Sequence, residues 1–372
     1  MSKICRWGFL STAEIGQKNW QAIHRSPNAT LGCVASRTRQ RAQEFIDQCQ
    51  ADYAFEPCPE ALEDYESLIQ HPDVDAVYIP LPTATRKEWV IKAANAGKHV
   101  LCEKPCASNF EDLVEMVEAC RHNNVQFMDG VMFMHSQRLN AIKHALEQEK
   151  AIGDVKRINC MFSFNAPEEF RQSNIRTDST LEPHGCLGDL GWYTIRFALW
   201  AMNGQMPSSV TGNMLSSLQR PGSPEPVPME FSGELIFGEN TSASFYVSFQ
   251  TGMQQSATIC GTDGQITIED FVLPYFGNQI EFGISNAEFM VEGCEFRMED
   301  HRQTRSVREY ANGAQQAQET FLFQRMSEIV NTGQTESYFS DYALKTQSVL
   351  DACFASAKTD GQPVNPKVLS TV

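Results

Sequence analysis

The chain has 372 residues, a length that favours two domains over a single core. Hydrophobic residues make up 42% of the chain and charged residues 20%, which is typical of globular proteins and not of disordered or fibrous ones. The formal net charge of −16 gives a surface that repels phosphate backbones and anionic membranes. We therefore expect neither a nucleic-acid partner nor a membrane partner.

The cysteines and the N-terminal segment favour a cytoplasmic protein. The twelve cysteines are scattered without a Cys-x-x-Cys pair, and the eight histidines show no metal-ligand spacing with them. We therefore expect free thiols and no metal site. Because the N-terminus runs directly into an apolar strand pattern, we expect no signal peptide, and no run of about twenty apolar residues predicts a transmembrane helix.

Strand and helix signals alternate over the first third of the chain. Apolar runs predict strands at 4–10, 30–36, 76–80, 99–102 and 125–129, and helical spacing predicts helices at 15–26, 39–50, 65–69, 87–96 and 109–123. Asn109 is a candidate N-cap for the last of these helices. Strand–helix alternation with short links predicts an α/β domain with a doubly wound parallel sheet.

The pattern changes near Asp129, so we predict a dinucleotide-binding domain over 1–128 and a second, α+β domain over 129–372. Successive strands over 155–164 and 210–268 predict a large, mainly antiparallel sheet in the second domain. Residues 279–282 and 289–296 are expected to add an edge hairpin. Helices are expected over 139–148, 189–200, 310–331 and 340–358.

The loop after the first predicted strand is a degenerate phosphate-binding turn. Residues 8–16 read GFLSTAEIG, with Ser11 and Ala13 where glycines are usual. Small residues still let the backbone approach a pyrophosphate, although these substitutions weaken the signal. The candidate cofactor-binding residues here are Gly8, Ser11, Thr12, Ala13, Glu14 and Ile15.

The end of the second predicted strand favours NADP over NAD. An NAD enzyme usually has an acidic residue at this point, which binds the ribose hydroxyls. This chain instead has Ser36, Arg37 and Arg39, and a hydroxyl with guanidinium groups suits a 2′-phosphate. NAD remains an alternative.

A lysine closes another predicted strand. The segment 100–105 reads VLCEKP, which places Lys104 at the carboxyl end of a strand, where ligands of open α/β sheets bind. Glu103 is the first partner that we expect for it.

These motifs together resemble one family. The degenerate loop, YIPLPT at 78–83, EKP at 103–105 and GDLGWY at 188–193 occur in order. The chain resembles the Gfo/Idh/MocA oxidoreductases over nearly its whole length. Within that family it is most similar to the branch of dimeric dihydrodiol dehydrogenases and NADP-dependent D-xylose dehydrogenases, with their plant relatives. The resemblance implies a Rossmann domain, a second domain whose open sheet often forms a homodimer, and a sugar, polyol or diol substrate.

The resemblance also assigns roles to residues. It implies that Lys104 contacts the cofactor ribose and the substrate region, and that Asp189, Gly191 and Tyr193 match the family's Asp-x-Gly-x-His/Tyr motif. Asp189 and Tyr193 lie four residues apart, so on one helix they would share a face. Further candidate cofactor contacts are Pro80, Leu81, Pro82, Thr83 and Glu103, and candidate substrate contacts are His135, Arg138, Arg176, His184 and Asp189. Arg86 stands where the family often has His. The polar contact that this His would make near the nicotinamide is therefore not expected with certainty here.

The expected chemistry is hydride transfer with Tyr193 as acid and base. A free tyrosine titrates near a pKa of about 10, and a nearby Lys104 would favour the phenolate and bring that pKa toward working pH. Asp189 would hold a substrate hydroxyl. Three alternatives stay open: a glycosidase acting by oxidation and elimination, a non-catalytic dinucleotide sensor, and a dimer with a purely structural role.

Overall fold

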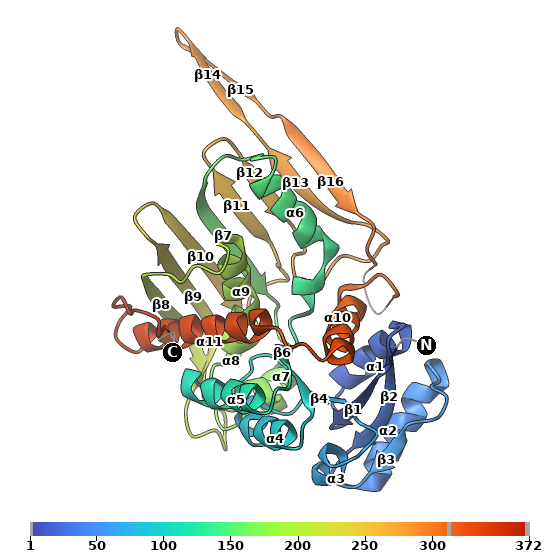
Figure 1. Ribbon diagram of the computed structural model, residues 1–372. Coiled ribbons are helices and arrows are strands. Elements are labelled where there is room, and N and C mark those ends of the chain that lie inside the picture. The colour runs from blue at the N-terminus through green and yellow to red at the C-terminus, as the bar shows by residue number, and fades with distance from the viewer. Residues whose placement is uncertain (1–2, 311–313, 369–372) are drawn as a thin grey trace.

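A computed structural model describes residues 3–310 and 314–368 of the chain. Two sheets dominate it, with helices around the first and mainly on one face of the second (Figure 1). Among the described residues no helix is long and apolar enough to cross a membrane. All twelve cysteines are free thiols.

The N-terminal sheet has six strands in the order β3-β2-β1-β4-β5-β6, and every pairing in it is parallel. This confirms the predicted doubly wound sheet. The crevice for a ligand lies between β1 and β4, where the strand order reverses. The strands are β1 (Cys5–Leu10), β2 (Ala29–Ala35), β3 (Glu60–Leu62), β4 (Ala76–Ile79), β5 (His99–Cys102) and β6 (Phe127–Asp129). The helices of this part are α1 (Ile15–Arg25), α2 (Arg39–Asp52), α3 (Tyr65–Ile69), α4 (Thr83–Asn95) and α5 (Phe110–His122).

The local sequence explains these elements. All four residues of β4 are buried, as expected for a parallel strand covered on both faces. Asn109 caps α5 as predicted, because its side chain accepts a hydrogen bond from the backbone N–H of Asp112 at 2.9 Å. Gly8 lies in a packed site: a Cβ atom there would come within 2.8 Å of Leu68 Cδ2. Its small size therefore makes room for α3.

The second sheet has eight strands in the order β16-β13-β12-β11-β7-β10-β9-β8. Only β7 and β10 pair in parallel, so the prediction of a mainly antiparallel sheet is confirmed. The strands are β7 (Val155–Ser163), β8 (Ser209–Leu218), β9 (Val227–Phe237), β10 (Thr241–Ser248), β11 (Ala257–Gly261), β12 (Gln265–Ile268), β13 (Ile280–Ser285) and β16 (Arg302–Val307). A separate hairpin is made of β14 (Glu288–Glu292) and β15 (Glu295–Glu299).

The helices of this part are η1 (Met132–His135), α6 (Gln137–Glu147), α7 (Glu168–Ser173), η2 (Ile175–Thr177), α8 (Gly185–Asp189), α9 (Gly191–Ala201), α10 (Gln318–Thr332) and α11 (Ser337–Ala357). The single helix predicted over 189–200 is wrong at its start, since α8 ends at Asp189 and α9 begins at Gly191. The helix predicted over 310–331 begins later, at Gln318, and residues 311–313 lie outside the described part.

Helix α10 returns to the N-terminal sheet. Its buried Leu322, Phe323 and Met326 belong to the same apolar cluster as Trp7 and Trp20. Trp7 donates a hydrogen bond to Ser327 Oγ at 3.0 Å, and its ring lies 4.9 Å from that of Phe323. Residues far past 129 therefore complete the core of the N-terminal domain, and the boundary at 128/129 stays a prediction.

Candidate active site

One cavity of about 610 Å³ connects the two parts of the chain. Its lining includes many residues predicted as site residues, from five separate segments: Ala13, Glu14, Ile15, Pro80, Leu81, Glu103, Lys104, Arg176, Asp189 and Tyr193. The segments converge because the carboxyl ends of β1, β4 and β5 lie at one edge of the sheet, facing α8 and α9.

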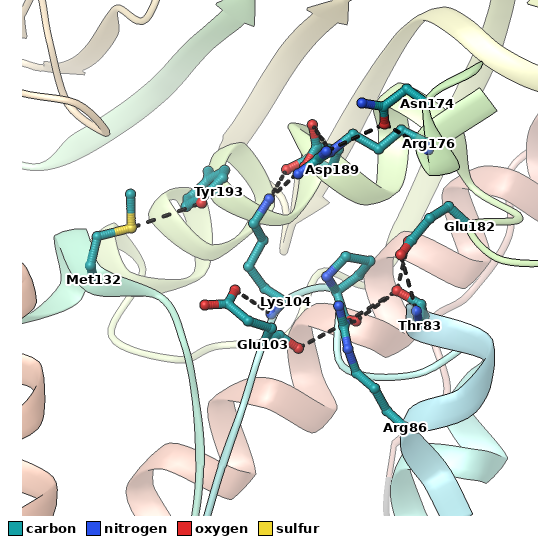
Figure 2. Close-up of polar contacts among 11 residues, drawn as sticks. Thr83, Arg86, Glu103, Lys104, Met132, Asn174, Arg176, Glu182, Asp189 and Tyr193 are labelled. Carbon is teal, nitrogen blue, oxygen red and sulfur yellow. Dashed lines mark hydrogen bonds and ion pairs between the residues drawn. The ribbon is translucent and has the colours of Figure 1, made fainter. Parts of the chain in front are cut away.

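Lys104, Asp189 and Tyr193 form the centre of the site (Figure 2). Lys104 Nζ donates to Asp189 Oδ1 at 2.6 Å and to the Asp189 carbonyl at 2.9 Å. The same ammonium lies 4.6 Å from the centre of the Tyr193 ring. Arg176 Nε approaches the other Asp189 oxygen at 2.9 Å. One carboxylate is therefore shared by two cations beside a phenol.

This arrangement fixes the charges of the cluster. Burial alone would raise the pKa of Asp189, but the charges of Arg176 and Lys104 hold it well below its ordinary value. Burial alone would lower the pKa of Lys104, but the charge of Asp189 raises it above its ordinary value. The carboxylate and the ammonium therefore both stay ionised at neutral pH.

The pKa of Tyr193 differs from the expectation. Burial raises it to about 12, and the opposing effect of Lys104 is smaller. The prediction that Lys104 brings this pKa toward working pH is therefore wrong for the protein without its ligands. The hydroxyl donates to the sulfur of Met132 at 3.8 Å. Because a thioether is a weak acceptor, this bond is easily exchanged for one to a substrate oxygen.

Glu103 lies beside Lys104 and is held by hydrogen bonds of its own. Its carboxylate accepts from the Tyr78 hydroxyl at 2.6 Å and from the backbone N–H of Lys104 at 3.1 Å. A Cβ atom on Gly130 would come within 3.0 Å of the Glu103 carboxylate, so glycine leaves this side chain its place. Glu103 thereby fixes the start of the turn that presents Lys104.

Arg86 fixes two turns of the site. It donates to the carbonyl of Leu81 at 2.6 Å and to that of Glu103 at 2.9 Å, and it also contacts the carbonyl of Pro105. The side chain is buried and lines the cavity. The residue that departs from the family pattern thus holds the loops after β4 and β5 together.

Thr83 and Pro82 lie outside the cavity lining. Thr83 is buried, and its hydroxyl donates to Glu182 at 2.6 Å and to the carbonyl of Pro105 at 3.2 Å. Its backbone N–H donates to the same carboxylate at 3.0 Å. Thr83 therefore joins α4 to the loop before α8. Pro82 precedes α4 as its N-cap.

Three of the expected substrate contacts, His135, Arg138 and His184, do not line this cavity. Arg138 is buried in an ion pair with Asp270. His135 stacks on Phe339 with ring centres 5.8 Å apart. His184 packs on Phe354 at 4.9 Å, and burial lowers its pKa to about 4. Each is held by a partner from a distant part of the chain, which local sequence does not reveal.

The remaining cofactor candidates, in β1 and in the loops after β1 and β2, are not part of the cavity lining. Ser11 has a φ of 138°, and its hydroxyl accepts from the N–H of Ala13 at 3.2 Å. The hydroxyls of Thr12 and Ser36 lie 3.4 Å apart, so the loops after β1 and β2 adjoin. Arg37 and Arg39 are exposed beside them. Gly8 lies inside the sheet, beneath Leu68.

The sequence alone did not reveal several residues of the site. Glu182, Met132 and Asn174 line or brace the cavity, and Leu322 and Phe323 of α10 close one side of it. Lys18 of α1 pairs with Glu319 of α10 at 2.5 Å at the same wall. The return of α10 to the N-terminal sheet brings Glu319, Leu322 and Phe323 to the cavity. Within residues 3–310 and 314–368, no group of three or more His, Cys, Asp or Glu side chains is placed to hold a metal ion.

A six-stranded parallel sheet with the strand order β3-β2-β1-β4-β5-β6 is typical of the dinucleotide-binding Rossmann fold. Two family models match the chain: the oxidoreductase family with an NAD-binding Rossmann fold over residues 5–131, and the Gfo/Idh/MocA C-terminal domain over residues 140–267. The chain belongs to the Gfo/Idh/MocA oxidoreductase family.

Similarity to individual proteins also supports membership of this family. The chain is 28% identical over 274 residues to trans-1,2-dihydrobenzene-1,2-diol dehydrogenase of Xenopus laevis, covering 72% of this chain and 76% of that one. It is 28% identical over 260 residues to D-xylose 1-dehydrogenase (NADP⁺) 2 of Haloferax volcanii, covering 70% and 74%. The aldose–aldose oxidoreductase of Caulobacter crescentus has the same fold, with a TM-score of 0.79, 20% identity and coverage of 98% and 100%.

Proposed function

We propose that this protein is an NADP(H)-dependent dehydrogenase or reductase. Its substrate would be a secondary alcohol, or the matching carbonyl, of a sugar, polyol or dihydrodiol. The observation that carries the proposal is the single cavity in which Lys104, Asp189 and Tyr193 meet the loop before α1. The relatives named for dihydrodiol and D-xylose dehydrogenation support the substrate class.

The residues around the cavity fit a nicotinamide dinucleotide. Helix α1 begins at the cavity without a side-chain cap, and the N–H groups of Gly16 and Gln17 donate to the carbonyls of Ala13 and Glu14. A pyrophosphate would therefore bind through the positive end of the helix and the loop before it. We assign residues 11–15 to that role. Ser36, Arg37 and Arg39 would bind a 2′-phosphate, and Leu81, Glu103 and Lys104 would lie along the nicotinamide ribose.

The cofactor would supply or accept the hydride at its nicotinamide ring. In carbonyl reduction, Tyr193 would donate its phenolic proton to the substrate oxygen as that oxygen gains negative charge. Lys104 would then stabilise the phenolate, and Asp189, held between Lys104 and Arg176, would accept a bond from a neighbouring substrate hydroxyl. In alcohol oxidation the same groups act in reverse.

Cofactor preference tests the proposal. Nicotinamide fluorescence titrations should show tighter binding of NADPH than of NADH. The double variant Arg37→Ser/Arg39→Ser should lose at least about 100-fold in NADPH affinity, because each of the two charge-assisted bonds to phosphate contributes roughly 1.5–3 kcal/mol. NADH affinity should change little.

The matched control is Arg121→Ser, which removes an exposed arginine that pairs with Asp341 far along the chain. It should leave both affinities unchanged. Tighter binding of NADH than of NADPH by the unaltered protein would contradict the assigned preference, and binding of neither would contradict the proposed function.

A further inference from the structure

One wall of the cavity is a short segment with few apolar anchors. We call residues 168–182, which contain α7 and η2, the wall segment. It contributes five residues to the cavity lining: Ser173, Asn174, Ile175, Arg176 and Glu182. None of the six residues of α7 is buried, although Phe170 packs on Phe249 with ring centres 5.2 Å apart. Polar contacts are therefore needed to fix the part of the segment that carries Arg176.

The position of Arg176 depends on Asn174. Arg176 extends from the wall segment to Asp189, which its Nε meets at 2.9 Å (Figure 2). The backbone N–H of Arg176 donates to Asn174 Oδ1 at 3.0 Å, and its Nη1 lies 3.4 Å from the same oxygen. The Asn174 side chain thus holds both the backbone and the guanidinium of Arg176. Whatever fixes the backbone of Asn174 therefore also fixes the second cation on Asp189.

Arg220, in the loop between β8 and β9, binds this backbone. Its Nη1 lies 3.1 Å from the carbonyl oxygens of Gln172 and Asn174 and 3.3 Å from the Thr177 hydroxyl. Its Nη2 donates to Asp178 Oδ2 at 2.8 Å. The side chain is only 14% exposed, so water competes little for these bonds. One guanidinium therefore joins four acceptors of the wall segment, although Arg220 is not part of the cavity lining.

The turn that follows Arg220 is built for this contact. The N–H of Ser223 donates to the Arg220 carbonyl at 3.1 Å, which closes a tight turn with Pro221 and Gly222 at its centre. Proline fixes φ at the first central position, and Gly222 has a φ of 88°, which glycine adopts without strain. The hydroxyl of Ser223 accepts from the N–H of Ser179 at 3.0 Å. Both ends of the turn therefore bind the wall segment.

The chemistry of this contact requires arginine. The carbonyl of Gln172 lies in the last turn of α7, where helix carbonyls have no acceptor role within the helix and attract a cation. A planar guanidinium presents several donors in fixed directions, so it can reach carbonyls and the Asp178 carboxylate at the same time. Lysine has one compact ammonium and could keep only part of this set.

We propose that Arg220 is a positioning residue of the active site, which keeps Arg176 against Asp189 by holding the wall segment. With Arg176 in place, both oxygens of Asp189 are fixed between two cations, ready for a substrate hydroxyl. Without Arg220 the wall segment shifts, Arg176 leaves Asp189, and the substrate binds less tightly. The cofactor contacts assigned to residues 11–15 and 36–39 belong to other loops and keep their positions.

Hydrogen–deuterium exchange on the full chain tests the positioning without relying on turnover. Arg220→Gln should accelerate exchange of the amides of residues 174–179 at least about 10-fold, because bonds to a charged group are lost, and should leave exchange in the N-terminal sheet unchanged. Gly222→Ala keeps every side chain of the contact but strains the turn, so it should accelerate the same amides about 5-fold. The matched control is Glu225→Gln, an exposed position on the same loop, which should change nothing. Unchanged exchange in Arg220→Gln, or faster exchange throughout the chain, would overturn the proposal.

Steady-state kinetics test the link to the substrate, and this part rests on the proposed function. Arg220→Gln should raise the KM for the substrate about 10-fold and lower kcat less than about threefold, because Arg176 and Asp189 hold substrate in the ground state as well as in the transition state. Its NADPH affinity should be unchanged. Arg220→Lys should recover part of the KM, because it keeps a charge beside Asp178. Weaker NADPH binding in Arg220→Gln would overturn the proposal.

A double-mutant cycle with Arg176→Gln separates positioning from a general loss of structure. If Arg220 acts through Arg176, adding Arg220→Gln to Arg176→Gln should change KM less than about twofold. Full additivity of the two substitutions would overturn the proposal, because Arg220 would then act by another route. Faster exchange in Arg220→Gln, together with no turnover by the unaltered protein, would contradict the proposed function and still support the hold of Arg220 on the wall segment.

Discussion

Tyr193 is held as a neutral phenol. Burial raises its pKa to about 12 and outweighs the opposing charge of Lys104, and its hydroxyl donates to the weak acceptor Met132. A neutral phenol is ready to donate a proton, which is what carbonyl reduction requires. Alcohol oxidation requires that the same phenol first lose its proton. The residue therefore favours different pH ranges for the two directions.

The pH dependence of the two directions should show this. Below its pKa the phenolate fraction rises tenfold per pH unit, so the kcat for alcohol oxidation should rise about tenfold per unit between about pH 7 and pH 10. The kcat for carbonyl reduction should stay nearly constant there, because the phenol remains protonated. Steady-state assays in both directions measure this. An oxidation rate that is flat over this range would show that another group controls proton transfer.

The central residues could be predicted from the sequence, and the peripheral ones could not. Lys104, Asp189 and Tyr193 lie in short motifs, and the structure brings them together. Arg138 was expected to face the substrate, but its partner Asp270 lies 132 residues further on. A buried arginine and a binding arginine look alike in a sequence, because the distinction depends on which distant side chain it meets.

At the scale of elements, a buried ion pair joins β6 to α9, the helix that carries Tyr193. Asp129 contacts Arg196 at 2.6 Å, with both side chains almost fully buried, and accepts from Trp192 Nε1 at 3.1 Å. Removing one partner of such a pair leaves an unpaired buried charge. Asp129→Asn should therefore lower the free energy of unfolding by about 3–5 kcal/mol, as measured by urea titration.

The exposed pair between Arg121 and Asp341 provides the control for that experiment. Asp341→Asn removes the same charge from a solvent-exposed pair and should cost less than about 1 kcal/mol. Equal effects of the two variants would show that the β6–α9 pair does not stabilise the joint between the two parts of the chain.

Another joint, between α5 and α11, should give a pH-dependent stability. Burial raises the pKa of Asp351 to about 6, although its carboxylate accepts from the N–H of Phe110 at 2.6 Å and from Gln347 at 2.7 Å. The unfolded chain loses this proton near pH 4, so the folded state is progressively destabilised between about pH 4 and pH 6.

Asp351→Asn should remove this penalty. The variant should be more stable than the unaltered protein above about pH 6, by at most about 2–3 kcal/mol, and the difference should shrink toward pH 4. Gln347 can accept from the new amide by turning over, because its Oε1 has no partner in the described structure. Thermal unfolding across this pH range measures the effect. The difference in stability between the variant and the unaltered protein should be larger at pH 8 than at pH 4. A smaller difference at pH 8 would contradict the raised pKa of Asp351.

The elements themselves were predictable where the pattern was strong. Buried parallel strands such as β4 appear as continuous apolar runs, and the Asn109 cap marks the start of α5. The strand β16, with the sequence RQTRSV, has no apolar alternation and was missed, because it is a largely exposed edge strand. The break between α8 and α9 was also missed, since the hydrophobic pattern continues through it.

At the scale of the whole molecule, the site depends on how the chain returns on itself. One wall of the cavity comes from the N-terminal sheet, one from α8 and α9, and one from α10 near the C-terminal end. The sequence indicated the two domains but not that α10 would complete the first. The proposed hydride transfer therefore requires all three walls of this composite cavity.

Turnover by the unaltered protein and by Tyr193→Phe is the most direct test. The oxidation of NADPH would be followed by absorbance with a panel of keto-sugars and diketones, and the reduction of NADP⁺ with aldoses, inositols and dihydrodiols. We predict turnover with at least one substrate, and a loss of about 10²–10⁴-fold in kcat in the variant with unchanged NADPH affinity. Tight NADPH binding without turnover on any of these substrates, or full activity in Tyr193→Phe, would contradict the account.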